Sequence, residues 1–389
     1  LAAYLKPYRK ESILAPLFKL LEALFDLLVP LVVARMIDAG GGRTVYLCFA
    51  DLIAMAAVGL GCSILAQYFA AKASVGFSGA LRQALFDHIQ SLSYTELDRL
   101  GSDTLITRLS DDINQVQNGL NLGLRLLLRS PFIVLGAMVM AFTIDFRSAL
   151  VFAVTIPVLF AVVFGIMLIS IPLFGKVQAG LDRVTAETRE NLTGVRVIRA
   201  FCREEQSVEE FEESNRALTK LNLFVGRISA LMNPLTYVLI NLGAVVLIRE
   251  AAGQVDLGVF QQGEVVALYN YMLQIIVELI KLASLIITLN KSLACAKRAA
   301  AILAVEPGMT YPAQAEAAPQ GAAAVEFRDV SFTYQGAGAP SLSGVSFAAK
   351  PGDTIGVIGG TGSGKSTLVD LIPRFYDATS GSVLLDGQD

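Results

Sequence analysis

The chain has 389 residues, of which 54% are hydrophobic and only 17% are charged, and its mean hydropathy is +0.58. Soluble domains average about 25% charged residues, so this composition excludes an ordinary soluble enzyme and indicates a membrane protein. The net charge of −3 and the lack of basic tracts argue against disorder, a collagen-like repeat and nucleic-acid binding. The four cysteines lie far apart in the sequence, and no cluster of histidine, cysteine and carboxylate residues indicates a metal site.

Six apolar stretches are each long enough to cross a bilayer, which takes about 20 mostly apolar residues in a helix. They are residues 13–37, 46–71, 120–142, 150–174, 221–248 and 265–289. Short turns join them in pairs, whereas long polar connections follow the second and the fourth stretch. Basic residues gather before the first stretch and in the two long connections. The positive-inside rule therefore places the N-terminus, both long connections and the C-terminus in the cytoplasm.

The long connections are predicted to continue the membrane helices into the cytoplasm. Apolar residues recur at helical spacing beyond the second span, at Leu81, Leu85, Ile89 and Leu92. A helix over residues 46–90 would measure about 67 Å, far more than the hydrocarbon core of about 30 Å. A short helix is expected at the tip of each extension, at about 94–101 and 195–202. These tips either cap their own hairpins or dock on another domain, and the change of composition after residue 305, which indicates a second domain, favours docking.

Ionisable residues within membrane spans are costly and usually face the interior of a bundle or a wet cavity. The predicted polar faces of the first and sixth spans give six candidate substrate-cavity residues: Glu22, Asp26, Tyr271, Gln274, Glu278 and Lys281. Two interpretations stay open. Opposite charges such as Lys19 and Glu22 form ion pairs that hold helices together, or the two faces line a substrate cavity. Because acids outnumber bases on these faces, the second interpretation predicts some preference for cationic amphiphiles.

The composition changes after residue 305. Residues 306–323 are rich in alanine, proline and glycine and are expected to form a linker. Hydrophobic residues then alternate from Val325 to Tyr334, which predicts a strand with an irregularity near Asp329. Further strands are expected at 345–348, at 354–358, where the strand would be buried, and near the C-terminus at 381–387.

A phosphate-loop motif follows directly on the strand expected at 354–358. The pattern G-x-x-x-x-G-K-[ST] is matched completely by Gly359, Gly360, Thr361, Gly362, Ser363, Gly364, Lys365 and Ser366, with Thr367 next. Glycines let backbone N–H groups surround phosphate oxygens. Lys365 is expected to reach the β- and γ-phosphates, and the Ser366 hydroxyl to ligate Mg²⁺. A strand before the loop and a helix after it, at 367–374, favour a nucleotide site over a glycine-rich turn without a ligand.

With these features together, the chain resembles an ATP-binding cassette (ABC) exporter half-transporter of the bacterial multidrug type. The resemblance implies a membrane all-α domain of six spans at 1–305, with long cytoplasmic extensions. The N-terminal part of an α/β P-loop nucleotide-binding domain would follow at 324–389. Residues 101–112 and 190–201 are similar to the two coupling-helix regions of the family. Tyr334 falls where the family places an aromatic side chain that stacks on adenine.

The resemblance also implies an activity. The chain would export amphiphilic small molecules, drugs or lipids, with ATP and Mg²⁺ as cofactors and a second half-transporter as partner in a homo- or heterodimer. It would be a multi-pass protein of the plasma or inner membrane, in contact with lipids, with its coupling helices and nucleotide-binding domain in the cytoplasm. Two alternatives stay open: a weakly hydrolytic, ATP-binding regulatory subunit of a heterodimer, and a membrane-anchored NTPase that transports nothing.

Several family motifs do not occur in this sequence. They are the water-positioning glutamine loop, the signature motif, the second acidic strand with its catalytic glutamate, and the switch histidine. We therefore expect the chain to be a fragment, truncated early in its nucleotide-binding domain, with no catalytic residues of its own and no ability to hydrolyse ATP by itself.

Overall fold

Long helices make up most of the chain. The structure, a computed structural model, describes residues 1–256, 261–309 and 322–388. A short 3₁₀ helix, η1 (Ala2–Tyr8), precedes the first long helix. The helices that follow are α1 (Arg9–Asp38), α2 (Arg43–Ser91), α3 (Tyr94–Leu100), α4 (Ser102–Thr107), the π-helical turn η2 (Arg108–Asp112), α5 (Ile113–Leu126), α6 (Arg129–Ile144), α7 (Phe146–Thr193), α8 (Val195–Ala200), α9 (Glu204–Ala230), α10 (Met232–Asp256) and α11 (Gln262–Leu303).

Five helical stretches in the described residues are long and apolar enough to span a bilayer. They are Arg43–Ser91, Ser102–Ile144, Phe146–Thr193, Glu204–Val255 and Gln262–Leu303. The remaining predicted span, the first in the chain, lies in α1, whose 30 residues are long enough to cross. Its apolar stretch carries three ionisable residues, Lys19, Glu22 and Asp26, and this charge distinguishes it from the other five.

Two spans that the sequence predicts as continuous are interrupted by proline. The stretch 120–142 is broken between α5 and α6, and the stretch 221–248 is broken at Leu231 between α9 and α10. In both cases a proline, Pro131 or Pro234, is the third residue of the new helix. Proline has no N–H to donate to the carbonyl four residues back, so it is tolerated best in the first turn of a helix, where no such bond is made.

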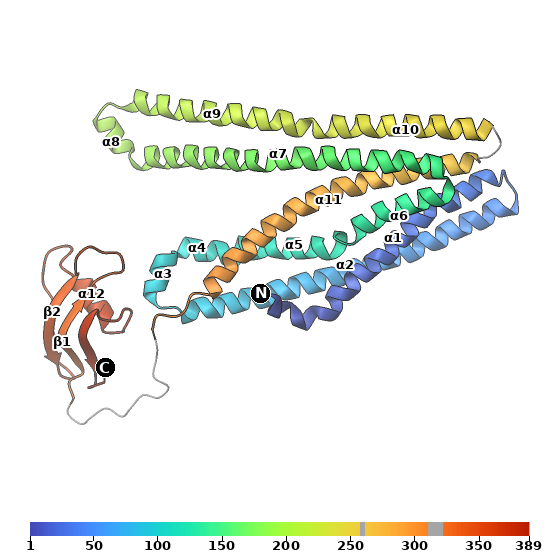
Figure 1. Cartoon of the computed structure of the whole chain (residues 1–389). Coiled ribbons are helices and arrows are strands. Elements are labelled where there is room, and N and C mark those ends of the chain that lie inside the picture. The colour runs from blue at the N-terminus through green and yellow to red at the C-terminus, as the bar shows by residue number, and fades with distance from the viewer. Residues whose placement is uncertain (257–260, 310–321, 389) are drawn as a thin grey trace. The chain divides into compact units, whose positions relative to one another are not determined.

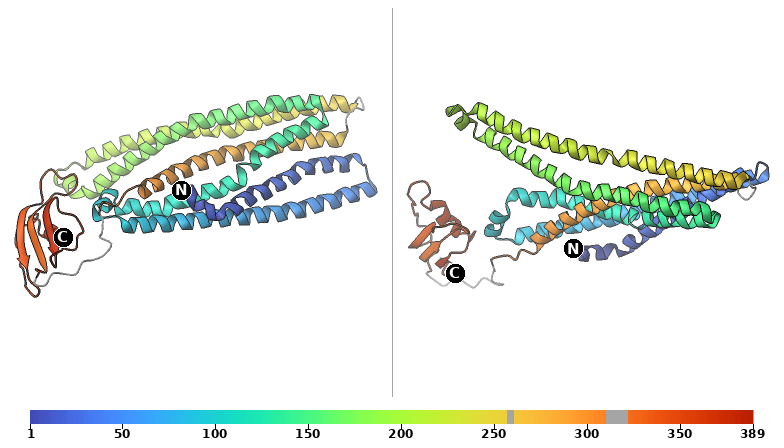
Figure 2. Two further views of the ribbon diagram at one scale, coloured as in Figure 1. Left: turned by 60° about the horizontal axis from the view of Figure 1, so that its bottom comes forward. Right: turned by 45° about the horizontal axis from the view of Figure 1, so that its top comes forward.

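The chain divides into two compact units. One contains Pro7–Ser74 and Gly119–Lys291, and the other contains Leu1–Lys6, Val75–Asn118 and Ser292–Asp389. In the first unit, α7 lies alongside the consecutive helices α9 and α10 in an antiparallel arrangement (Figures 1 and 2). Its core is formed by small and aliphatic side chains with a few aromatic ones, among them Ala137, Phe152, Leu247, Tyr271 and Ile275.

The outer faces of these helices remain apolar. Leu60, Leu168 and Val245 are each more than 60% exposed, and many similar side chains line the same helices. Soluble proteins rarely expose apolar surface so continuously. Lipid contact accounts for this exposure, because helices satisfy their own backbone hydrogen bonds and can present apolar side chains to the bilayer.

The part of α2 that extends beyond the predicted span belongs to the other unit and has the predicted amphipathic pattern. Leu81 and Leu85 are fully buried and Ile89 is nearly so, as their helical spacing indicates. An ion pair between helices adds to this packing: Asp112 is buried, and its Oδ2 accepts hydrogen bonds from Arg108 on the preceding turn and from Arg298 on α11, both at 2.9 Å.

The C-terminal part of this unit is a small antiparallel sheet with one helix. Strands β1 (Val325–Phe332), β2 (Leu342–Ala349) and β3 (Ser380–Leu385) pair in the order β2-β1-β3, and the helix is α12 (Lys365–Leu371). The predicted irregularity near Asp329 is confirmed: the register shifts there and Asp329 has a φ of 48°. The core consists of Phe327, Val330, Phe332, Leu342 and Leu371.

The prediction of a strand at 354–358 is wrong. These residues form no regular element, and Ile358 is 95% exposed. The physical reason is the lack of a neighbour. An apolar strand is stable only when adjacent strands take up its N–H and C=O groups, and the three strands in the described residues pair with one another instead. The linker predicted at 306–323 lies mostly outside the described residues.

Candidate functional site

The phosphate-loop motif forms a tight turn that leads into α12. Gly362 and Gly364 both have positive φ values, 84° and 83°, which glycine adopts without strain. A Cβ atom at Gly364 would lie 2.7 Å from the carbonyl oxygen of Ser341, so only glycine fits there. The turn ends at Gly364, and Lys365 is the first residue of α12.

The ammonium of Lys365 lies within this turn. Its Nζ donates to the carbonyl oxygen of Gly359 at 3.0 Å and to that of Gly360 at 2.7 Å. These partners are neutral and lie five and six residues back along the chain, so the positive charge is held in place but not neutralised. The first N–H groups of α12, beginning with that of Lys365, have no acceptor within the helix. Within the described residues this cation has no carboxylate partner, and a backbone turn with such a cation beside the first N–H groups of a helix suits the oxygens of a phosphate.

The side chains after Lys365 differ in their accessibility. Ser366 is exposed, so its hydroxyl is free to approach a metal ion bound to phosphates. Thr367 is buried, and its hydroxyl shares a hydrogen bond of 3.1 Å with the hydroxyl of Tyr334. Three or more histidine, cysteine or acidic residues do not gather into a metal site anywhere in the described part of the chain.

Tyr334 lies beside the phosphate loop, two residues after the end of β1. Its ring packs edge-on against Phe332, with centroids 4.7 Å apart, and against Tyr376 at 5.3 Å. The side chain is half-buried. The aromatic side chain predicted to meet adenine is therefore fixed by two neighbouring rings and by its hydroxyl, close to the phosphate loop.

The short helix α3 contacts this α/β part within the same unit. The ring of Tyr94 lies against Phe375, with centroids 4.5 Å apart, and the hydroxyl of Tyr376 donates to Asp98 Oδ2 at 2.6 Å. This hydrogen bond to a carboxylate, together with burial, raises the pKa of Tyr376, so the phenol stays protonated and remains a donor. Phe375 and Tyr376, which meet α3, were not predicted from the sequence. The only signal was an aromatic pair just after the expected helix.

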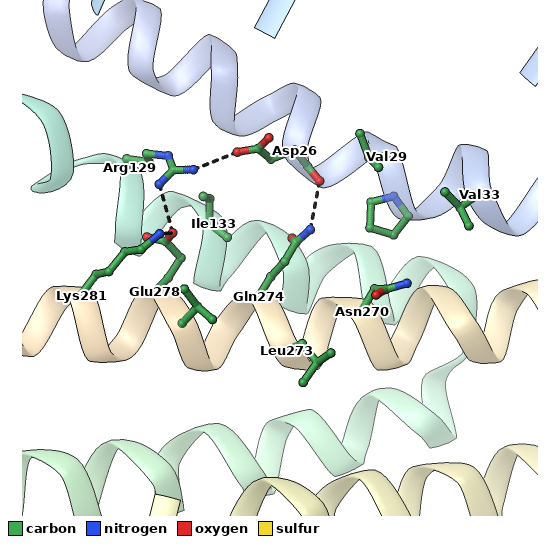
Figure 3. A pocket seen from close by; sticks show the side chains of 12 residues that line it. Asp26, Val29, Val33, Arg129, Ile133, Asn270, Leu273, Gln274, Glu278 and Lys281 are labelled. Carbon is green, nitrogen blue, oxygen red and sulfur yellow. Dashed lines mark hydrogen bonds and ion pairs between the residues drawn. The ribbon is translucent and has the colours of Figure 1, made fainter. Parts of the chain in front are cut away.

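In the other unit, Arg129 of α6 reaches carboxylates on two other helices (Figure 3). Its guanidinium donates to Asp26 Oδ2 on α1 at 2.9 Å and to Glu278 Oε1 on α11 at 3.1 Å. Oε1 of Glu22, also on α1, lies 3.9 Å from Nη2 of Arg129. The Arg129 side chain is 12% exposed and that of Glu278 only 4%, so this pair is largely shielded from solvent, whereas Asp26 is half-exposed. Since acids from two helices share one guanidinium, the arrangement joins α1, α6 and α11.

Glu278 is the most buried acid of this group, with its side chain 4% exposed. Besides Arg129, it accepts hydrogen bonds from Ser130 Oγ at 2.8 Å and from Lys281 Nζ at 2.9 Å. Partners of this kind are needed because an isolated carboxylate in a low-dielectric interior is very costly. We call the connected residues the Arg129 cluster; it comprises Lys19, Glu22, Asp26, Arg129, Glu278 and Lys281.

A cavity of about 510 Å³ lies beside the Arg129 cluster, between α1, α6 and α11 (Figure 3). Its wall combines polar side chains with apolar ones: Asp26, Arg129, Asn270, Gln274, Glu278 and Lys281 with Val29, Pro30, Val33, Ile133, Leu273 and Val277. Gln274 donates to the carbonyl oxygen of Asp26 at 3.2 Å, while its own Oε1 is buried and has no hydrogen-bond partner among the described residues. The cavity therefore offers charge of both signs and an unused acceptor next to apolar surface.

Comparison with known proteins identifies the family. The family description of the ABC transporter transmembrane region matches residues 12–279, and that of the ABC transporter matches residues 342–389. This chain belongs to the ABC transporter family. An uncharacterized ABC transporter ATP-binding protein of Mycobacterium tuberculosis is 32% identical over the whole chain, which covers 68% of that protein.

Two other relatives have names that state a substrate. A fatty acid ABC transporter ATP-binding/permease protein of Mycobacterium tuberculosis is 30% identical, over 79% of this chain and 48% of that protein. An ATP-dependent lipid A-core flippase of Syntrophus aciditrophicus is 27% identical, over 79% of this chain and 51% of that protein. Membership of the family implies ATP binding and transport across a membrane coupled to ATP.

The structure brings together part of what the sequence predicts for this ABC transporter. Four of the six candidate substrate-cavity residues line the cavity: Asp26, Gln274, Glu278 and Lys281. Glu22 pairs with Lys19 within the Arg129 cluster. Tyr271 does not line this cavity: it is fully buried, and its hydroxyl donates to the carbonyl oxygen of Leu27 at 2.6 Å.

In the membrane helices, sequence reasoning missed Arg129. On the faces of the first and sixth spans alone, acids outnumber bases, and the predicted preference for cationic amphiphiles rests on this excess. With Arg129 added, the cluster holds three acids and three bases, so that argument fails. The available signal was an arginine inside the third apolar stretch, where any ionisable residue needs a partner.

Proposed function

We propose that this chain is one half of a dimeric ABC exporter that uses ATP to move amphiphilic small molecules, drugs or lipids across the cell membrane. The observation that carries the proposal is the phosphate loop at 359–367, with Lys365 held in it, in a chain whose membrane helices enclose a cavity with both polar and apolar walls. The basic residues that gather in the long connections support a cytoplasmic position for the loop.

In this proposal the phosphate loop binds ATP. The ammonium of Lys365 pairs with the β- and γ-phosphates, and the first N–H groups of α12 donate to phosphate oxygens. Ser366, which is exposed, ligates Mg²⁺, and Mg²⁺ supplies charge neutralisation at the phosphates. Tyr334 stacks on the adenine, held by Phe332 and Tyr376. Positioning and electrostatics account for this part of the chemistry, as is general in phosphoryl transfer.

The contact at α3 supports mechanical coupling to the membrane helices. α3 is joined to the long helix α2 by only Leu92 and Ser93, and it meets the α/β part through Tyr94 and Asp98. Glu96 strengthens its N-terminus by accepting the backbone N–H of Ser93 at 2.9 Å, as in a capping box. A movement of the α/β part on binding ATP would thus be passed to α2. The tip at α8 would serve a second such contact.

The cavity beside the Arg129 cluster supports an amphiphilic substrate. Apolar side chains such as Val33 and Leu273 suit a hydrocarbon portion, and the charged wall suits a polar head. Relatives named for fatty acids and for lipid A favour lipid-like cargo. The balanced charge of the cluster favours neither cationic nor anionic heads as a class.

The experiment is ATP-driven flux of a fluorescent phospholipid or amphiphile in proteoliposomes that contain the complete transporter. Lys365→Ala should reduce flux and nucleotide binding by about 100-fold or more, because it removes a charge aimed at the phosphates. The matched control is Lys350→Ala, an exposed lysine of the same α/β part outside the loop. Undiminished flux in a dimer that carries Lys365→Ala in both copies would refute the proposal.

A further inference from the structure

The chain that follows α11 contacts the junction of α2 with α3. The end of α11, at Leu303, lies beside that junction in the same compact unit (Figures 1 and 2). His88, the one histidine of the chain, lies in the last turn of α2, and its Nε2 is 2.9 Å from the carbonyl oxygen of Val305. A carbonyl oxygen only accepts hydrogen bonds, so Nε2 carries the hydrogen, in the neutral and the protonated ring alike. The bond joins residues that are 217 positions apart.

A second hydrogen bond holds the same segment three residues further on. The backbone N–H of Gly308 donates to the carboxylate of Glu96 on α3. Burial by itself raises the pKa of Glu96, but hydrogen bonds from Ser93 and from this N–H outweigh burial and hold the pKa below its ordinary value. The carboxylate therefore stays charged, and a hydrogen bond to a charged acceptor is about twice as strong as one between neutral groups.

The approach of the chain to Glu96 requires glycine at position 308. A Cβ atom added to Gly308 would lie 2.5 Å from Oε1 of Glu96. That carboxylate is not free to turn away, because its Oε2 accepts the backbone N–H of Ser93 at 2.9 Å. The next residue, Met309, is only 8% exposed. Two hydrogen bonds, a close backbone contact and a buried side chain thus hold residues 305–309 to α2 and α3, and we call this contact the 305–309 clamp.

The last turns of α11 are attached to η2 and α5 as well. Nε of Arg298 donates to Oδ2 of the buried Asp112 at 2.9 Å. Oγ of Ser292 donates to the carbonyl oxygen of Gln115 at 2.7 Å. These two bonds do not involve α2 or α3, whereas the 305–309 clamp does. The clamp is therefore a contact through which the end of α11 and the α2–α3 junction are held as one piece.

The position of the clamp in the chain gives it a mechanical consequence. Residues 305–309 lie in sequence between α11 and the α/β part, so a displacement of the α/β part acts on them through the covalent chain. The same displacement acts on α3 through Tyr94 and Asp98. A loose segment would yield, and α11 would not follow. A segment held by His88 and Glu96 passes the displacement to α2 and α11 together.

We propose that His88 and Glu96 are positioning residues of the transport cycle: through the 305–309 clamp they make α2 and α11 move as one piece when the α/β part moves. This inference rests on the proposed function for the movement itself. It adds a second membrane helix, α11, to a path that through α3 alone leads only to α2. Loss of the clamp should leave ATP binding intact, because neither residue belongs to the phosphate loop, and should lower the number of molecules moved per ATP.

The first test measures the joint movement without transport. Spin labels are placed on exposed positions of α2 and α11 by Gln90→Cys and Lys297→Cys in the complete transporter, with the exposed thiol removed by Cys202→Ser. Electron spin resonance in nanodiscs then gives the distance between the labels with and without ATP and Mg²⁺. We expect one narrow distance, the same in both conditions. His88→Leu, which removes the donor, should broaden it about twofold once ATP is added, whereas Gln83→Leu, which loses a hydrogen bond only within α2, should not.

The second test measures coupling. Flux of a fluorescent amphiphile and hydrolysis of ATP are measured in the same proteoliposomes, and their ratio is compared between variants. His88→Leu should lower the ratio about two- to fivefold, the scale of one lost hydrogen bond. His88→Gln should restore most of it, because the amide N–H donates to the same carbonyl. Gly308→Ala should lower the ratio at least as much, because its Cβ displaces Glu96, whereas Gly338→Ala, with no atom within 4 Å of the added Cβ, should leave it unchanged.

The outcomes separate the clamp from the transport function. An unchanged ratio in His88→Leu, equal losses in His88→Leu and His88→Gln, or an unbroadened distance in His88→Leu would each refute the clamp. If His88→Leu does not fold, Gly308→Ala takes its place in both tests. A wild-type protein that hydrolyses ATP but moves no amphiphile would refute the proposed function, and the distances between the spin labels would still decide for or against the clamp.

Discussion

The phosphate loop and the Arg129 cluster are each built around one long basic side chain, but they hold it in different ways. Lys365 is held by carbonyl oxygens five and six residues back in the same turn. Arg129 is held by carboxylates that are 103 and 149 residues distant in sequence, on two other helices. The first cation is fixed by local backbone geometry, and the second by the packing of three helices.

The difference follows from the surroundings of each charge. In the membrane unit an unpaired charge is strongly unfavourable, so Arg129 and Glu278 must neutralise one another. The phosphate loop is accessible to water, which solvates the ammonium of Lys365, so neutral partners are sufficient. A cation without a counter-charge is available to an anionic ligand, whereas a cation that is already paired contributes first to the stability of the helix bundle.

The comparison predicts that the largest loss of stability comes from the buried cluster. Arg129→Leu should lower the free energy of unfolding by about 3–5 kcal/mol, because it leaves Asp26 and Glu278 without their shared partner. Thermal unfolding in detergent measures this. Arg147→Leu, at an exposed position of α7, is the control and should change little. An Arg129→Leu protein as stable as the wild type would show that the pairs contribute nothing.

A smaller effect is expected from the backbone of the phosphate loop. Gly364→Ala should destabilise the α/β part by about 2–3 kcal/mol and weaken nucleotide binding, because alanine is strained at a φ of 83° and its Cβ would meet Ser341. Gly352→Ala is a matched control. Its φ is 91° but no atom lies within 4 Å of the added Cβ, so it should cost only about 1 kcal/mol. Equal effects of the two substitutions would mean that the close approach is unimportant.

The aromatic side chain beside the loop should have a moderate effect on binding alone. Tyr334→Ala should weaken ATP binding by about 1–2 kcal/mol, the usual worth of stacking between an aromatic ring and a base. Fluorescent nucleotide titration measures the affinity. Tyr334→Phe keeps the ring and loses only the hydrogen bond to Thr367, so it should bind nearly as well as the wild type. If the two variants bind ATP equally weakly, the hydroxyl and not the ring is important.

The smallest loss of stability should come from the exposed edge of the Arg129 cluster. The side chain of Asp26 is 43% exposed, against 4% for Glu278. Asp26→Asn should therefore lower the free energy of unfolding by about 0.5–1 kcal/mol, whereas Glu278→Gln should lower it by considerably more. Thermal unfolding of the two variants under the same conditions provides the comparison. A reversed order would contradict the burial argument.

Local sequence patterns predicted much of the fold. The long amphipathic extension of α2, the short helices α3 and α8, and the bulge near Asp329 all follow from periodicity and turn chemistry over a few residues. The same reasoning failed at 354–358, where an apolar segment has no partner strand in the described residues and remains exposed. Whether a hydrophobic run becomes a strand depends on its neighbours, which periodicity does not report.

By itself, the sequence determined the phosphate loop, because eight consecutive residues contain both the glycines that shape the turn and the lysine that occupies it. It also determined that the chain belongs in a membrane, because hydropathy is a sum over each segment. Only the tertiary structure showed that Arg129 balances the acids of α1 and α11 and that Tyr271 is buried in the core. Charge pairing between helices depends on which faces meet, and that is decided by packing across more than 100 residues of chain.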